Sequence, residues 1–96
     1  MKKVYLAFLW HQHQPIYKNP LNNVYELPWV RLHATKDYYD MAAILEDYPK
    51  IKSNINLVPS LLVQLDEYAR GEAKDKFLDL TLKPALELSE EDKIFI

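Results

Sequence analysis

The amino-acid sequence predicts an α/β fold that begins with a strand, a helix, a second strand and a second helix, a βαβα arrangement. Three observations predict it. Residues 3–10 form a β-rich and almost entirely apolar run, residues 29–47 carry apolar side chains at helical spacing, and residues 53–58 form a second short β-rich run. Two strands joined through a helix are expected to lie parallel.

The first strand is predicted over residues 3–10. Its apolar part is too short for a membrane helix, and it ends in His-Gln-His without the small-residue cleavage site of a signal peptide. A strand that is apolar throughout is typical of a parallel sheet covered on both faces. Residues 11–28 contain Pro15, Pro20 and Pro28 and are predicted to form a long loop, of the kind that often has a function.

The first helix is predicted from Trp29 to Asp47, and Pro49 follows its end. Asp37 and Asp40 lie one turn apart on it, and we expect them to be solvated surface charges rather than an acid–base pair. The apolar stripe consists of Val30, Ala34, Tyr38, Met41, Leu45 and Tyr48.

The second strand is predicted over residues 53–58, and Pro59 suits the first turn of the helix that follows. Gly71 occupies the position just after the end of this second helix, where glycine is favoured. Residues 74–88 are helical in composition but interrupted by Pro84.

A last helix is predicted to begin after Ser89, whose hydroxyl can cap it, with acidic residues in the first turn. The apolar residues that follow suggest that this helix continues. We therefore expect residues 1–96 to be the beginning of a larger domain.

The composition excludes several classes of protein and of binding partner. The chain has 96 residues, 49% of them apolar, and a formal net charge of −2 without a block of like charges, which argues against a nucleic-acid partner. No segment is long and apolar enough to predict a membrane partner. Zero cysteines exclude disulfides and thiolate metal sites and fit a cytoplasmic protein.

His11 and His13 are the first candidate site residues. In an extended segment both rings lie on one side, at the carboxyl end of a strand, where α/β proteins place ligands. Three interpretations remain open: a zinc site as in amidohydrolase-type barrels, a substrate site, or hydrogen bonds to loop backbone. Zinc would need further ligands, and only His33, predicted within the helix, is left among the histidines.

Aromatic residues flank the same loop, with Trp29 at its end. A flat ring beside His, Gln and Asn side chains suits a sugar, although ordinary packing is the better explanation for any single aromatic residue. Gln14 and Asn56, the latter near the end of the second strand, complete the candidate substrate-binding set of His11, His13, Gln14, Trp29 and Asn56.

Three ordered segments resemble glycoside hydrolase family 57, most closely its α-amylase and amylopullulanase-like members. They are His11-Gln12-His13-Gln14-Pro15, the run from Leu27 to Met41 (LPWVRLHATKDYYDM), and the run from Asn56 to Leu62 (NLVPSLL). The resemblance covers essentially the whole chain.

The resemblance implies that residues 1–96 are the N-terminal βαβα portion of a (β/α)7 catalytic barrel. It also implies a retaining mechanism on α-1,4- or α-1,6-glucans, with a Glu nucleophile and an Asp acid/base held roughly 5–5.5 Å apart. His11 and His13 would then contact the reacting sugar, with no metal and no cofactor.

The sequence departs from the family pattern because none of its acidic residues matches either catalytic motif. Both carboxylates are expected beyond residue 96, so the segment alone should be inactive. Two alternatives are a metal-dependent amidohydrolase-like barrel and a non-catalytic carbohydrate-binding or structural domain.

Overall fold

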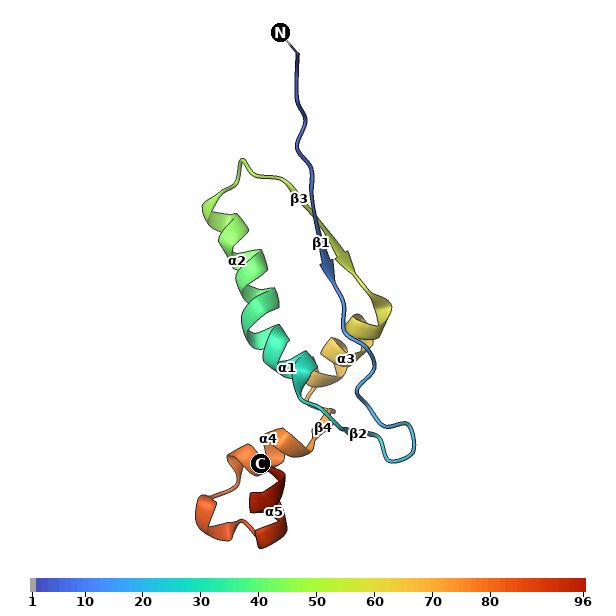
Figure 1. Ribbon diagram of the computed structural model, residues 1–96, viewed down its shortest axis with the longest axis vertical. Helices are drawn as coiled ribbons and strands as arrows, with labels where there is room; N and C mark the ends of the chain where they lie inside the picture. Colours follow the sequence, from blue (N-terminus) through green and yellow to red (C-terminus); the bar gives the residue numbers. More distant parts are fainter. Residues whose placement is uncertain (1) are drawn as a thin grey trace.

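The computed structural model describes residues 2–96 and shows an elongated molecule (Figure 1). Its radius of gyration is 18.3 Å, whereas a compact domain of this length would have about 12–13 Å. Its accessible surface is 7838 Å², and a compact monomer of this mass would expose roughly 5,800 Å². The described residues therefore cover comparatively little of their own apolar surface.

A two-stranded parallel sheet forms the centre of the fold. Strand β1 (Phe8–Gln12) pairs with β3 (Ser53–Leu57), in a register that runs from Phe8 opposite Ser53 to Gln12 opposite Leu57. The predicted parallel βαβ unit is confirmed. The predicted bounds of the first strand are wrong, because β3 offers no partner to the residues before Phe8, and Val4 remains 92% exposed.

One long helix connects the two strands, as predicted for residues 29–47. It comprises α1 (Trp29–His33), a π-helical segment η1 (Ala34–Tyr38) and α2 (Tyr39–Asp47), and it runs alongside the sheet (Figure 1). The apolar spacing did not reveal the π-helical turn. Within it, the Thr35 hydroxyl donates to the carbonyl of Arg31, four residues earlier.

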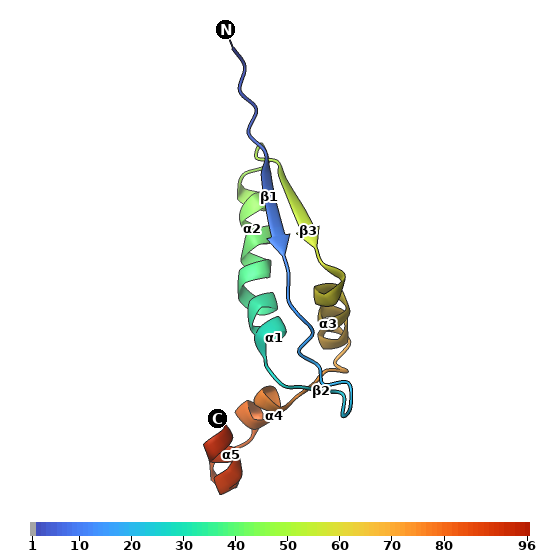
Figure 2. The same cartoon turned by 45° about the vertical axis from the view of Figure 1, so that its right-hand side comes forward.

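The long helix covers one face of the sheet and leaves the other open (Figure 2). Trp10 lies against the α2 side chains, and the Gln12 amide donates to the sulfur of Met41 at 3.5 Å. The alternate side chains of both strands project from the opposite face, and all of them are exposed. They are Leu9, His11, Asn54 and Asn56. The expectation of cover on both faces is therefore wrong for the described residues.

The second helix, α3 (Pro59–Ala69), begins with Pro59 and is followed by Gly71 at φ +70°, as predicted. Two short parallel strands, β2 (Val24–Tyr25) and β4 (Lys74–Asp75), were not predicted, because two residues are too few for a recognisable pattern. They tie the end of the loop over residues 11–28 to the segment after α3.

The remaining helices lie away from the sheet in both views (Figures 1 and 2). They are α4 (Lys76–Leu82), the 3₁₀ turn η2 (Ala85–Glu87) and α5 (Glu90–Phe95). The predicted cap is confirmed: the Ser89 hydroxyl accepts from the Asp92 amide, and the Asp92 carboxylate accepts from the Ser89 amide. Lys83, whose ammonium group donates to the Asp92 carboxylate at 2.8 Å, and then the Ser89 amide lower the pKa of the Asp92 carboxyl to about 2.

A buried carboxylate joins three of these elements. Asp75 is 1% exposed and accepts hydrogen bonds from Arg31 Nε at 2.9 Å and the Tyr68 hydroxyl at 3.0 Å. It also caps α4 through the amide of Leu78. Because all its partners are donors, Asp75 is satisfied although it is buried.

A second polar group continues the network toward the loop. Tyr25 is buried, packs its ring 4.8 Å from that of Tyr68, and donates its hydroxyl to Glu67. Lys18 pairs with the same carboxylate at 2.7 Å and holds the pKa of Glu67 below its ordinary value. Burial, followed by the adjacent Glu67, raises the pKa of the Tyr25 hydroxyl. The interior between the loop, α1 and α3 is therefore largely polar, and its stability depends on hydrogen-bond donors that are matched by acceptors.

Removing Asp75 should therefore destabilise the full-length protein strongly. We expect Asp75→Ala to lower the free energy of unfolding by about 3–5 kcal/mol, because Arg31, the Tyr68 hydroxyl and the Leu78 amide lose their acceptor. Asp40→Ala, at an exposed position on α2, should change it by less than about 0.5 kcal/mol. Chemical denaturation measures both, and equal effects would contradict the assigned role of Asp75.

Residues 1–96 expressed alone should lack a cooperative thermal transition, because the exposed apolar surface and unpaired strand edges leave too few contacts to offset chain entropy. We expect poor solubility or a molten state, with a helical far-UV circular dichroism spectrum. A sharp two-state melt would show that the segment is a domain in its own right.

Candidate functional site

Three of the candidate residues lie together on the open face of the sheet. His11 in β1 is directly opposite Asn56 in β3, so both side chains project from the same face near the carboxyl ends of the strands. His13 follows two residues later, and its ring stacks on that of His11 with centroids 5.7 Å apart and an interplanar angle of 13°. All three side chains are exposed and available to a ligand.

Gln14 lies beside this group but is held by the protein itself. Its amide nitrogen donates to the Tyr38 hydroxyl at 3.0 Å, and its amide oxygen accepts from the Tyr17 hydroxyl at 2.9 Å. The Tyr38 hydroxyl also donates to the carbonyl of His13 at 3.5 Å. One N–H and one lone pair of the Gln14 amide remain for a ligand.

Helix α3 holds the backbone that follows the histidines. The Ser60 hydroxyl donates to the carbonyl of Gln14 at 2.7 Å. Gln64 is 2% exposed; its oxygen accepts from the Tyr17 amide at 2.9 Å, and its nitrogen donates to the Pro15 carbonyl at 2.8 Å. The loop is therefore attached to the next βα unit by both edges of one buried amide.

Trp29 belongs to a separate aromatic group on the helix. Its ring is 6.1 Å from that of His33, which is in turn 6.2 Å from Tyr38. His33 Nδ1 pairs with Asp37, one turn later. Within residues 2–96, the hydroxyl of Tyr38 makes the hydrogen bonds that connect this group with His13 and Gln14. The structure therefore places the candidate residues in two neighbouring groups.

The two aspartates of the helix differ. Asp40 is exposed and makes no side-chain hydrogen bond within residues 2–96, in keeping with a solvated charge. Asp37 is half-buried and bound to His33, which the expectation of a plain surface charge missed. The spacing of His33 and Asp37, i and i+4 on a predicted helix, was the signal that could have found the pair.

Metal ligands are not clustered in this part of the chain. Within residues 2–96, no three His, Asp or Glu side chains are grouped closely enough to hold an ion. A zinc site at His11 and His13 would therefore need ligands from outside these residues.

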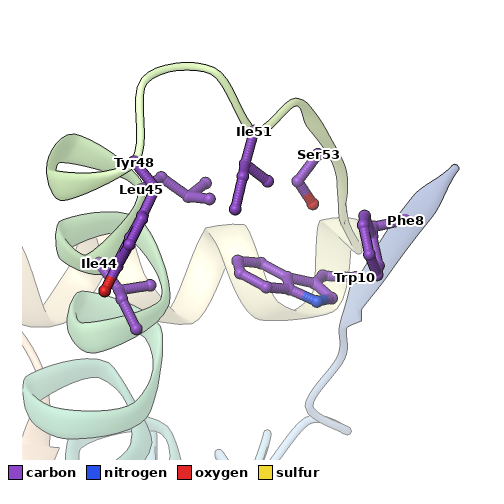
Figure 3. Close-up of a pocket in the computed structure, with 7 residues that line it drawn as sticks. All are labelled: Phe8, Trp10, Ile44, Leu45, Tyr48, Ile51 and Ser53. Carbon is purple, nitrogen blue, oxygen red and sulfur yellow. The ribbon is translucent and has the colours of Figure 1, made fainter. Parts of the chain in front are cut away.

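A cavity lies elsewhere among the described residues. A pocket of about 390 Å³ opens between α2 and the first residues of both strands (Figure 3), with Trp10 facing Ile44 and Leu45. Its lining is largely apolar, although Ser53 and Tyr48 each carry a hydroxyl group. The pocket lies at the amino ends of the strands, opposite the histidines. It is a packing gap between helix and sheet rather than a place for chemistry.

The open face offers hydrogen bonds rather than reaction chemistry. Imidazoles and an amide can bind hydroxyl groups, but the described face contains no carboxylate. Sequence reasoning missed Ser60 and Gln64. The signal for Gln64 was its place three residues after the buried Leu61, on the apolar side of α3.

No helix within residues 2–96 has both the length and the apolar character needed to cross a membrane. No curated protein and no solved structure matches the chain significantly. Residues 7–94, however, match the family model described as Glycosyl hydrolase family 57, a family of (β/α)7 barrels whose members hydrolyse or transfer glycosyl groups of glucans. The match spans nearly the whole chain, which therefore belongs to glycosyl hydrolase family 57.

Proposed function

We propose that this chain is the N-terminal part of the catalytic barrel of a retaining enzyme that cleaves or transfers α-1,4- or α-1,6-linked glucans, of the α-amylase or amylopullulanase type. His11 and His13 bind hydroxyls of the reacting sugar, and Asn56 supports them. Gln14 and Trp29 line the adjoining wall. The enzyme needs no cofactor, and a cytoplasmic location is consistent with the absence of cysteine.

The observation that supports this most is the register of β1 and β3. It brings His11 opposite Asn56 on the one face that the helices leave open, with His13 stacked beside them. In a barrel the helices cover the outside, so the open face is the inside, and ligands bind at the carboxyl ends of the strands.

The catalytic carboxylates are proposed to come from strands beyond residue 96. Retaining enzymes need two carboxyl groups about 5–5.5 Å apart at the substrate. In residues 2–96 the buried carboxylate Asp75 is engaged with Arg31, and no acidic side chain lies on the open sheet face. The segment alone is therefore expected to form part of the substrate-binding wall without catalysing the reaction.

A metal-dependent amidohydrolase-like barrel is the second candidate. The adjacent positions of His11 and His13, with ring centroids 5.7 Å apart, favour it, because two imidazoles on the same side of the chain can bind one ion after rotation of their side chains. It differs in requiring a stoichiometric metal.

Substitution of His13 in the full-length enzyme tests the proposal. We expect His13→Ala to lower kcat/KM on an α-glucan by roughly 10²-fold or more, since hydrogen bonds that strengthen in the transition state are lost. The metal content, measured by elemental analysis, should not change.

Asn54→Ala provides the matched control. Asn54 lies on the same face but two residues farther from the carboxyl ends than Asn56, so activity should stay within a few-fold of wild type. Loss of a bound metal in His13→Ala would favour the amidohydrolase alternative. Unchanged glucan activity in that variant would refute the assigned role of His13.

A further inference from the structure

A histidine–carboxylate pair that the proposed function does not use joins the end of α1 to the π-helical turn η1. His33 closes α1, and its Nδ1 is bonded to a carboxylate oxygen of Asp37 within the turn. π-helical turns are rare in proteins and often occur at functional sites, because they insert a residue into an otherwise regular helix. This turn lies next to the loop that follows β1, since its last residue, Tyr38, is bonded to Gln14.

The pairing determines which nitrogen of His33 faces outward. Because the Asp37 carboxylate accepts the Nδ1 proton, the neutral ring presents Nε2 as an acceptor. No hydrogen bond within residues 2–96 uses that nitrogen. The side chains of His33 and Asp37 are 38% and 46% exposed, so the pair is held in place yet open to solvent.

The surroundings of the ring suit a sugar. Trp29 and Tyr38 flank His33 with ring centroids 6.1 and 6.2 Å away, and Trp29 is 44% exposed. An exposed indole can cover the apolar face of a pyranose, while the Nε2 atom of a fixed imidazole accepts a hydrogen bond from a sugar hydroxyl. A pair that only stabilised an exposed helix would need neither the aromatic neighbours nor the bond from Tyr38 to the loop.

We propose that His33, oriented by Asp37 and flanked by Trp29, binds a hydroxyl of a glucosyl unit neighbouring the one held by His11 and His13. The inference rests on the proposed function, because it assumes an α-glucan chain on the open face. His33 lies on the helix and not on the sheet, with Tyr38 and Gln14 between it and the stacked histidines. It therefore serves an adjoining subsite.

The test compares substrates of different chain length with the full-length enzyme. His33→Phe keeps a ring between Trp29 and Tyr38 but removes both nitrogens, and Asp37→Asn removes only the carboxylate that orients the ring. We expect kcat/KM on a long maltooligosaccharide to fall about 10-fold in His33→Phe and a few-fold in Asp37→Asn. On the shortest maltooligosaccharide that the wild type cleaves, both variants should stay within about two-fold of wild type.

Asp40→Asn, at the exposed aspartate three residues later on the same helix, should match wild type on every substrate. Equal losses on short and long substrates would overturn the inference, because they would mean a structural role. Unchanged activity on both would overturn it as well. If the wild-type enzyme cleaved no α-glucan, the proposed function would fail first, and that outcome is distinct from either result with the variants.

Discussion

The parallel pairing of β1 with β3 is the constraint on which the rest of this structure depends. Its register sets His11 opposite Asn56, and strand alternation then sends Trp10 and Gln12 to the helix side. A shift of one residue would turn the histidine toward α2 and the tryptophan into the open. The same pairing thus determines both how the helix packs and which polar groups can meet a ligand.

The loop after β1 is positioned by polar contacts rather than by an apolar core. Gln64 bonds the backbone on both sides of Ile16, and Tyr38 bonds the side chain of Gln14. A buried amide with fixed partners places a backbone more narrowly than apolar packing does, because its donors and acceptors must all be matched. Stability and site geometry therefore share residues: α3 supports the loop, and the loop supplies His13.

Much of this organisation could be predicted from the sequence, and the exceptions have physical causes. The helix over residues 29–47, the proline at the start of α3 and the Ser89 cap follow from local chemistry, which a sequence shows directly. The start of β1 could not be predicted, because it depends on where a distant strand begins.

The candidate site was predictable to a similar extent. The convergence of His11 and His13 follows from strand geometry, whereas the position of Asn56 opposite His11 required the register. The roles of Gln64 and Tyr38 depend on loop contacts between residues far apart in the sequence. Spacing places Gln64 and Tyr38 on the apolar sides of their helices. It does not reveal which loop groups they bond, because polar networks of this kind have no periodic signature.

A crystal structure of the full-length enzyme with a bound maltooligosaccharide tests the central claim most directly. The account predicts a glucosyl unit on the open face of the sheet, with its hydroxyls within about 3.2 Å of the ring nitrogens of His11 and His13. A metal ion coordinated by both imidazoles, or a sugar bound only at a site remote from them, would contradict it.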